Sequence, residues 1–254
     1  MTDPAAPACL ERSGRPRLAY RHTPGAGPTI VFLPGYMSDM AGGKATALFD
    51  WAAAEGQACL LLDYAGCGLS DGAFVDQTLL DWRGDILDLI DAKVEGPVLL
   101  VGSSLGGWLM LLTAIALTGR DGAARVAGLV GIAAAPDFTD WGFSDAEKAL
   151  ILTDGELIEE TPYGDQPYVT TRAFWQSGEA NRLLGGPIAL ACPARLLHGQ
   201  DDDDVPPDIS LRLAAALTGG DVQVTLVKGG DHRLSRDSDI ALLIDTVARF
   251  ANPI

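Results

Sequence analysis

The sequence predicts an α/β fold: an open, mainly parallel, doubly wound sheet with helices on both faces. Short runs rich in leucine or β-branched residues alternate with segments of helical period, which is the pattern of strand–helix–strand units. Several of these runs are apolar throughout, as expected of strands covered on both faces. The chain has 254 residues, 48% of them hydrophobic, so residues 1–254 are expected to form a single domain with a large core.

Strands are predicted where apolar runs lie between turn residues, at residues 29–33, 59–63, 98–102, 127–133, 195–198 and 222–228. Helices are predicted where apolar residues recur three or four positions apart, at residues 79–89, 206–217 and 240–247. Pro206 and Pro207 suit the first turn of the second helix.

Residues 137–190 break this alternation and are predicted to form a short helical cap inserted after the strand at 127–133. The stretch has no run typical of a buried strand, and Ser144-x-x-Glu147 is the capping box of one of two expected helices. It holds seven of the 17 aromatic residues: Phe138, Trp141, Phe143, Tyr163, Tyr168, Phe174 and Trp175. Aromatic side chains suit a lid over an apolar pocket, so Trp141, Phe174 and Trp175 are predicted to bind substrate. The alternative is that they anchor the insertion to the sheet.

The balance of 18 basic and 34 acidic residues gives a net charge of −16, which repels nucleic-acid phosphates and anionic lipid headgroups. No nucleic-acid partner is therefore expected. The uncharged stretch at residues 98–119 is long enough to span a membrane. Gly102, Gly106 and Gly107 divide it, which favours a strand followed by a buried helix. No membrane span is predicted.

The cysteines point to a reducing compartment. The chain has four of them, scattered and without a C-x-x-C pair, unlike the dense framework of a small secreted domain. The first ten residues carry an acid and two prolines where a secretory signal would be basic and then apolar. A cytoplasmic location is therefore expected.

The clearest chemical signal is Gly102-Ser103-Ser104-Leu105-Gly106, a G-x-S-x-G pattern between a predicted strand and an apolar helical run. A tight strand-to-helix turn leaves room only for very small neighbours and exposes the serine hydroxyl. It also directs the amides of the helix N-terminus at negative charge that develops nearby. Only Ser104 fits this register, so Ser104 is predicted to be a nucleophile. The alternative is a turn without a chemical role.

A serine hydroxyl needs a base, and the chain has three histidines. His22 precedes the predicted strands and is expected at the surface. His198 ends a predicted strand and is expected to shape the following loop. His232 follows the last predicted strand, where a loop can carry its imidazole over the carboxyl edge of the sheet. His232 is therefore predicted to be the general base.

A carboxylate earlier in the chain than His232 would hold the imidazole in one tautomer and stabilise its protonated form. Residues 201–204 are all aspartate and follow a predicted strand. The spacing of H-G-x-x-D favours Asp202, while Asp203 and Asp204 remain alternatives. A solvated acidic turn before the next helix accounts for the rest of the run.

No metal or cofactor is predicted. The aspartate run lacks the D-x-D-x-D-G spacing of a calcium loop. The glycine-containing loop at residues 63–70 has Asp71 where the third glycine of a dinucleotide-binding motif would stand.

Acyl transfer also requires hydrogen-bond donors for an oxyanion. The backbone N–H of Leu105, next to the predicted nucleophile, is one candidate. The second is the N–H of Tyr36, freed by the sharp turn after the strand at 29–33. The alternative for Gly35 is a turn residue without a functional role.

These motifs resemble the α/β-hydrolase superfamily, and within it the serine esterases of the abhydrolase domain-containing protein ten group, which includes palmitoyl-protein thioesterases and acyl-glucuronide esterases. The resemblance spans most of the chain, and its specific pieces are Gly35-Tyr36-Met37-Ser38 with Gly43-Lys44-Ala45, Asp63-Tyr64-Ala65-Gly66-Cys67-Gly68, Gly102-Ser103-Ser104-Leu105-Gly106-Gly107-Trp108-Leu109 and Gly230-Asp231-His232-Arg233. It implies an α/β-hydrolase fold, a catalytic triad of Ser104, Asp202 and His232, and a short cap over an acyl pocket. No mitochondrial presequence is visible, so a bacterial member of the group is expected.

The predicted function is hydrolysis of a small-molecule carboxylic ester or thioester through a Ser104 acyl-enzyme. Since a histidine base has an ordinary pKa of about 6.5, activity is expected to fall below about pH 6. An acyltransferase or C–C bond hydrolase with the same triad is an alternative, and so is a ligand receptor that keeps the turn only as structure. A homodimer is left open, as are acyl length and leaving group.

Overall fold

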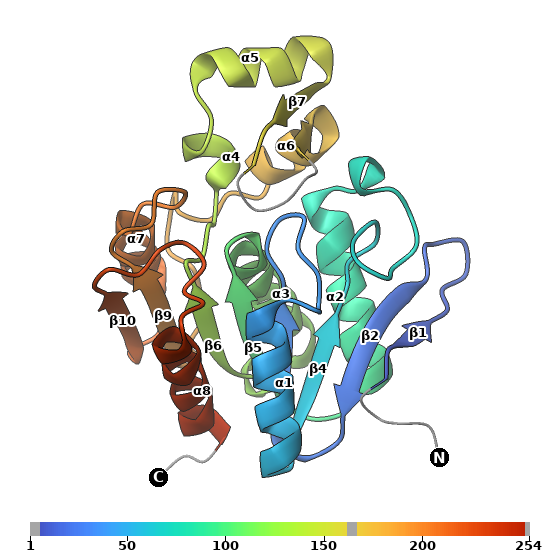
Figure 1. Cartoon of the computed structure of the whole chain (residues 1–254), viewed down its shortest axis with the longest axis vertical. Helices are drawn as coiled ribbons and strands as arrows, with labels where there is room; N and C mark the ends of the chain where they lie inside the picture. Colours follow the sequence, from blue (N-terminus) through green and yellow to red (C-terminus); the bar gives the residue numbers. More distant parts are fainter. Residues whose placement is uncertain (1–5, 162–166, 252–254) are drawn as a thin grey trace.

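An eight-stranded sheet with helices on both faces forms the body of the molecule (Figure 1). The structure is a computed structural model that describes residues 6–161 and 167–251. The strands run in the order β1-β2-β4-β3-β5-β6-β9-β10. Their bounds are β1 Ala8–Leu10, β2 Leu18–Thr23, β3 Ala26–Leu33, β4 Gln57–Leu62, β5 Val98–Ser103, β6 Val126–Ile132, β9 Ala194–Gly199 and β10 Val222–Val227.

The six strands from β4 to β10 in this order pair in parallel, while β1 and β2 pair antiparallel at one side. The predicted α/β fold with a mainly parallel sheet is therefore confirmed. The five helices around the sheet are α1 Gly43–Glu55, α2 Leu79–Lys93, α3 Leu105–Asp121, α7 Asp208–Ala216 and α8 Asp237–Ala251, with short 3-10 turns η1 Phe74–Asp76 and η2 Ala123–Arg125. The predicted helices at 79–89 and 240–247 lie within α2 and α8, and the helix predicted at 206–217 is α7.

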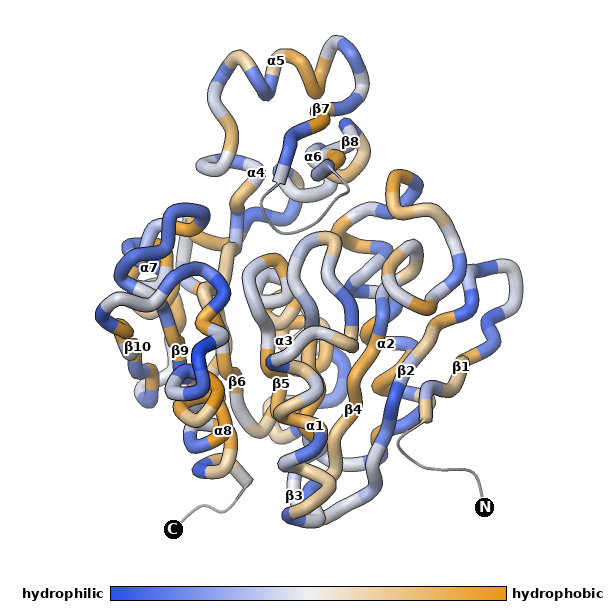
Figure 2. The backbone as a smooth tube through the Cα atoms, viewed as in Figure 1, coloured by the Kyte–Doolittle hydropathy of each residue, from blue (hydrophilic) through white to orange (hydrophobic). Residues whose placement is uncertain are grey.

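Two apolar cores, one on each face, hold the helices to the sheet. Buried side chains of α2, α3 and α7 pack with alternate residues of the strands on one face. Those of α1 and α8 pack on the other face. Hydrophobic residues along β4, β5 and β6 stand out in Figure 2. Each strand between two helix layers is buried on both faces, which explains why β4 is apolar along most of its length.

The strands β1 and β2 and the helix α1 were not predicted from the sequence. His22 was expected at the surface ahead of the sheet, but it lies half-buried in β2 and pairs with Leu60 of β4. That expectation is wrong because β2 lies near the edge of the sheet, where a strand can carry polar side chains and needs no continuous apolar run.

The segment between β6 and β9 stands beyond the carboxyl ends of the central strands, at the top of Figure 1. It contains α4 Phe138–Trp141, α5 Asp145–Asp154, β7 Glu156–Glu159, β8 Tyr168–Thr171 and α6 Arg172–Glu179. The capping box at the start of α5 is present, with Ser144 Oγ accepting from the Glu147 amide at 3.3 Å. We call residues 137–190 the cap segment. Tyr163, one of its predicted aromatic residues, lies outside the described residues.

The strands β7 and β8 pair antiparallel in a small second sheet, which the sequence analysis did not predict. Residues of β7 alternate between exposed and half-buried, so the strand lacks the apolar run that marks a buried strand. The strand can be recognised only from its pairing with β8, which begins nine residues after β7 ends.

Within the described ranges, no helix combines the length and the apolar character needed to cross a membrane. The uncharged stretch at residues 98–119 is divided between β5 and α3, as its glycines predicted.

Candidate active site

Ser104 occupies a sharp turn between β5 and α3. Its backbone has φ 54° and ψ −120°, a conformation that costs a non-glycine residue energy and is found at functional sites. The turn is possible only because its neighbours lack side chains. A Cβ on Gly102 would lie 2.3 Å from the carbonyl oxygen of Gly106, and a Cβ on Gly106 would lie 2.1 Å from that of Leu33. Both glycines of the G-x-S-x-G pattern are therefore required because each lies too close to another backbone segment to carry a side chain.

We expect Gly106→Ala to lower the free energy of unfolding by about 1–3 kcal/mol or more, because the added methyl would collide with rigid backbone. Urea denaturation measures this. Gly119→Ala, in the same helix but with nothing within 4 Å of its Cβ, is the matched control and should gain roughly 0.5–1 kcal/mol from helix propensity. A Gly106→Ala protein as stable as the unchanged chain would contradict the packing argument.

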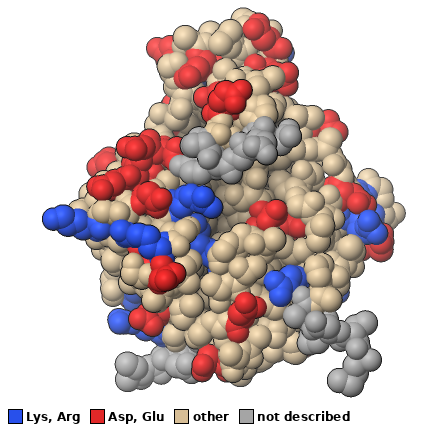
Figure 3. Space-filling model, in the orientation of Figure 1, with Lys and Arg blue, Asp and Glu red and all other residues tan. Residues whose placement is uncertain are grey.

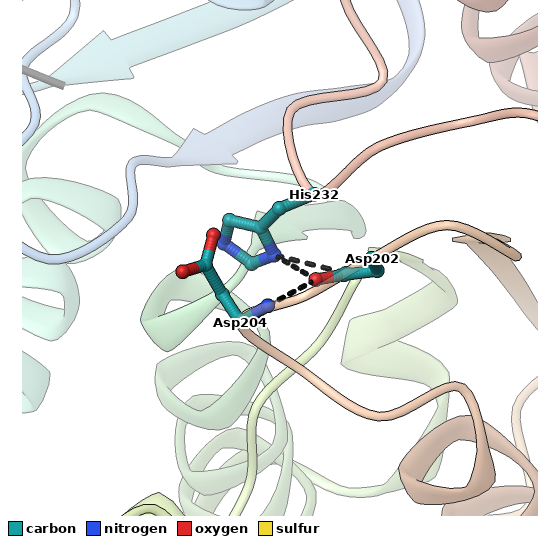
Figure 4. A group of neighbouring side chains, drawn as sticks. All are labelled: Asp202, Asp204 and His232. Carbon is teal, nitrogen blue, oxygen red and sulfur yellow. Dashed lines mark hydrogen bonds and ion pairs between the residues drawn. The ribbon is translucent and has the colours of Figure 1, made fainter. Parts of the chain in front are cut away.

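Ser104, Asp202 and His232 meet at the carboxyl edge of the sheet, each on the loop that follows a different strand. His232 Nε2 lies 3.2 Å from Ser104 Oγ. On the other side of the ring, Nδ1 lies 3.0 Å from Asp202 Oδ2 and 3.1 Å from Oδ1, as Figure 4 shows. Residues 30 to 128 positions apart in the sequence are brought into one hydrogen-bonded series of hydroxyl, imidazole and carboxylate.

Asp202 is the buried member of the aspartate run, whereas Asp203 and Asp204 are exposed. Burial raises the pKa of Asp202, but hydrogen bonds from His198, His232 and the Val205 amide outweigh it and hold that pKa well below the ordinary range. Asp202 is therefore a carboxylate at any pH near neutrality.

The two residues whose amides are predicted to bind the oxyanion belong to segments that lie next to Ser104. Leu105 is the first residue of α3, where a backbone N–H has no acceptor within the helix. Tyr36 belongs to the loop after β3, which closes a turn through the bond from Ser38 N to Gly35 O at 3.2 Å. This loop passes close to the serine, because a Cβ on Gly35 would lie 3.4 Å from Ser104 Cβ. Both Tyr36 and Leu105 line the cavity described next.

A cavity of about 350 Å³ opens between the cap segment and the carboxyl edge of the sheet. Ser104 and His232 are part of its wall. The cap segment supplies aromatic side chains to the same wall: Phe138, Trp141, Phe143 and Tyr168. The cavity wall is therefore largely aromatic on the cap side, where Glu159 and Thr170 also line it, and carries the reactive groups on the sheet side.

Two of the three predicted substrate-binding residues do not line this cavity. Phe174 is 2% exposed and packs against Tyr36, Trp82 and Phe138. Trp175 donates its Nε1–H to the carbonyl of Thr139 at 3.0 Å. Phe174 thus anchors α6 to the sheet domain, which was the alternative weighed for the cap aromatics, whereas Trp175 ties α6 to α4 within the cap segment. The expectation that these two rings lie at the cavity is wrong, while Trp141 does lie in the cavity wall.

Sequence reasoning gave no role to two cations in the cavity wall, Lys44 and Arg233. The Lys44 ammonium donates a hydrogen bond to the carbonyl of Arg233, next to His232. Burial, together with the positive charge of Arg233, lowers the pKa of Lys44 to about 8. Figure 3 shows basic side chains gathered beside the hollow under the cap segment, while acidic ones are spread over the cap and flanks. The sequence signal that could have drawn attention to Lys44 and Arg233 is that both are basic residues in a strongly acidic chain.

Asp202, Asp204 and His232 could together offer ligand atoms to a metal ion, since one such atom from each lies within 4.8 Å of the others. Asp204 faces the His232 ring in Figure 4. Both ring nitrogens of His232 already have partners, Asp202 and Ser104. A metal ion would have to displace one of them, so the same side chains cannot serve both arrangements at once.

The fold and this site define the class of protein. The chain belongs to the alpha/beta hydrolase family, whose pattern matches residues 30–246. A mouse protein named palmitoyl-protein thioesterase ABHD10, mitochondrial, is 42% identical over 242 residues, which is 94% of this chain and 80% of the mouse protein.

Two solved structures are similar along nearly the whole chain. A putative hydrolase from Agrobacterium vitis has a TM-score of 0.91 and 36% identity, covering 97% of this chain and 99% of that one. The mouse alpha/beta hydrolase domain-containing protein 10 has a TM-score of 0.87 and 40% identity, covering 96% and 97%. The resemblance inferred from the motifs is thus confirmed at the level of the family and of this group of relatives.

Proposed function

We propose that this chain is a serine hydrolase that cleaves carboxylic esters or thioesters through a covalent acyl-enzyme. The observation that carries the proposal is the contact of 3.2 Å between Ser104 Oγ and His232 Nε2 at the wall of a cavity. A hydroxyl at hydrogen-bond distance from an imidazole whose other nitrogen faces a carboxylate has the arrangement needed for nucleophilic attack.

In the proposed reaction, Ser104 Oγ attacks the acyl carbonyl while His232 Nε2 takes its proton. The negative charge on the former carbonyl oxygen is stabilised by the amides of Tyr36 and Leu105. His232 then gives the proton to the leaving alcohol or thiol, and the acyl group stays on Ser104. In the second half, His232 takes a proton from water as the water oxygen attacks the acyl carbon. The bond from that carbon to Ser104 Oγ then breaks, His232 returns the proton to Ser104 Oγ, and the carboxylic acid departs. Asp202 holds Nδ1–H throughout.

We propose that residues 137–190 act as a lid for this chemistry within one domain spanning residues 1–254. The aromatic side chains that the cap segment places in the cavity support this role. The cap is not an independent unit, because Phe174, Ile188 and Leu190 belong to the same buried core as the sheet and α3.

The proposed substrates are small acyl esters and acyl thioesters. The mouse relative's name specifies a palmitoyl-protein thioesterase, which supports a thioester as one member of the substrate class. The decisive experiment compares p-nitrophenyl esters of increasing acyl length with matched acyl thioesters, beside labelling by a fluorophosphonate probe. Turnover of either series with labelling of Ser104 is expected. A chain that neither turns over these substrates nor reacts with the probe is not a serine hydrolase.

Trp141→Ala should change acyl-length selectivity, because it removes a large ring from the cavity wall. A change of about tenfold in the ratio of kcat/KM for long over short esters is expected, the scale of a few methylene contacts. Trp175→Ala is the matched control, since that ring lies outside the cavity wall. If both variants move the ratio equally, the cavity is not the acyl site.

The pH profile should show one acid ionisation between pH 4 and pH 8. Because the Asp202 pKa is depressed in the folded chain, its carboxylate contributes stability above its ordinary pKa of about 3.9. That contribution is lost only as the pH falls through the depressed value. Protonation of Asp202 therefore cannot cause a loss of activity above pH 4, whereas protonation of an imidazole base can. We expect kcat/KM to fall below about pH 6, and a flat profile down to pH 4.5 would contradict a histidine base.

We further propose a reducing compartment, with the cytoplasm as the expected one. All four cysteines are free thiols, two of them buried. The mouse relative is named as mitochondrial, so subcellular fractionation in the native host is the deciding measurement.

Sedimentation analysis would test whether the chain forms a homodimer.

A further inference from the structure

A second histidine lies on the far side of Asp202 from His232. His198 is in β9, is 0% exposed, and has a partner for each ring nitrogen. Its Nδ1 lies 2.7 Å from Ser210 Oγ on α7, and Ser210 is itself 1% exposed. Its Nε2 lies 2.9 Å from the carbonyl oxygen of Val205 and 3.2 Å from Asp202 Oδ2.

These contacts fix where the ring carries its hydrogen. Nε2 faces two oxygens that can only accept, a backbone carbonyl and an ionised carboxylate, so Nε2 must be protonated. Nδ1 faces a hydroxyl, which can donate to it, so the neutral ring satisfies every contact. The two acceptors at Nε2 therefore set the tautomer of His198, and the Ser210 hydroxyl, donating to Nδ1, holds the ring in its orientation.

The contacts of Asp202 divide between its two oxygens. Oδ1 accepts from the amides of Asp204 at 3.0 Å and Val205 at 2.8 Å, and also lies 3.1 Å from His232 Nδ1. Oδ2 lies between the two imidazoles, 3.2 Å from His198 Nε2 and 3.0 Å from His232 Nδ1. Rotation of the carboxylate would break contacts on both sides. Asp202 is thus held in the plane it presents to His232.

We propose that His198, oriented by Ser210, is a positioning residue for the Ser104–His232–Asp202 site, acting through the Oδ2 atom of Asp202. This inference rests on the proposed hydrolase function. His198 does two things there: it fixes the direction of Oδ2, and it draws part of the carboxylate's negative charge away from His232. The second effect means that losing His198 stabilises the protonated form of His232.

Hydrogen bonding by His198 is also one of the influences that hold the Asp202 pKa low against the opposing effect of burial. Charged side chains near His232 include Asp204, which lies beside its ring, and the cations Lys44 and Arg233 of the same cavity wall. All three stay unchanged in every variant below, so their influence on the pH profile is constant across the series.

The test compares His198→Leu, His198→Gln and Ser210→Ala with Thr113→Val. Leucine removes both ring contacts, whereas a glutamine amide keeps one donor and one acceptor. Thr113 is buried in α3, and its hydroxyl has no hydrogen-bond partner within the described ranges. Thr113→Val therefore controls for the loss of a buried polar group away from Asp202.

For His198→Leu, kcat is expected to fall by about 10–100-fold with little change in KM, the scale seen when partners that orient a ligating histidine are removed. The acid limb of kcat/KM should move to higher pH. Ser210→Ala should give a smaller change in the same direction. His198→Gln should stay within about threefold, and Thr113→Val should be unchanged.

A readout independent of turnover is the proton NMR signal of His232 Nδ1–H, which should shift in His198→Leu and Ser210→Ala but not in Thr113→Val. A His198→Leu protein with unchanged kcat and signal overturns the proposal. So does an equal loss of kcat in His198→Leu and His198→Gln with an unmoved acid limb, which would make His198 a packing residue. If no Ser104-dependent turnover exists at all, the hydrolase function fails, and the NMR comparison still decides whether His198 orients the site.

Discussion

Ser104→Ala should lower kcat by a factor of about 10⁴ or more, with the fold and the cavity intact. Removing the hydroxyl abolishes the acyl-enzyme, so any remaining turnover depends on the oxyanion amides and on direct attack by water. Alanine fits the site without strain beyond that already present, because Ser104 keeps its positive φ for backbone reasons. The measurement is kcat for the best p-nitrophenyl ester, with burst kinetics to detect the acyl-enzyme.

Ser103→Ala is the matched control for register, because Ser103 is the neighbouring hydroxyl and also touches the cavity. It should retain most of the activity. Residual turnover above a tenth of the unchanged rate in Ser104→Ala, or a larger loss in Ser103→Ala, would move the nucleophile elsewhere.

Asp202→Asn should lower kcat by a factor of about 10⁴, the scale seen when the acid of a serine triad becomes an amide. The contacts explain why so small a change is so costly. The asparagine carbonyl would take the place of Oδ1, where two backbone amides donate. Its NH₂ group would then face His232 Nδ1, which must accept a hydrogen bond instead of donating one. In that tautomer Nε2 carries the hydrogen and cannot take the proton of Ser104.

Asp203→Asn is the control within the same run, because its side chain is exposed and lies outside the cavity wall. It should leave kcat within about threefold, whereas Asp204→Asn, in the cavity wall beside His232, tests the remaining alternative. A loss in Asp204→Asn that matches the loss in Asp202→Asn would reopen the choice among the aspartates.

Much of the fold followed from the sequence where burial on both faces forces a strand to be apolar. The strands β4, β5 and β6 each form such a run, and the prediction placed them within a residue or two at each end. By contrast β2 and β7 have polar or exposed positions. Their existence depends on pairing with strands that no local pattern reveals.

The candidate site shows the same division. Ser104 could be predicted because close backbone contacts require glycine on either side of it, and these glycines are visible in the sequence. His232 could be predicted because the chain has only three histidines. The role of Phe174 could not be found, since an aromatic side chain that seals a core and one that lines a cavity look alike in sequence. His198 was assigned to loop shaping alone, because nothing in the sequence shows that its ring reaches the Asp202 carboxylate.

Tyr36 connects the loop beside Ser104 to the cap segment. Its backbone lies beside Ser104, while its hydroxyl donates to the carbonyl of Val169 in β8 at 2.6 Å, and its ring packs against Phe138 and Tyr168. A chain lacking the cap segment would therefore do more than expose the cavity to solvent. It would also remove the hydroxyl's acceptor and the cap side of the ring packing from the residue whose amide is proposed to receive the oxyanion, leaving Phe74 and Trp82 against the ring. Exchanging one lid for another therefore requires replacements for these cap contacts.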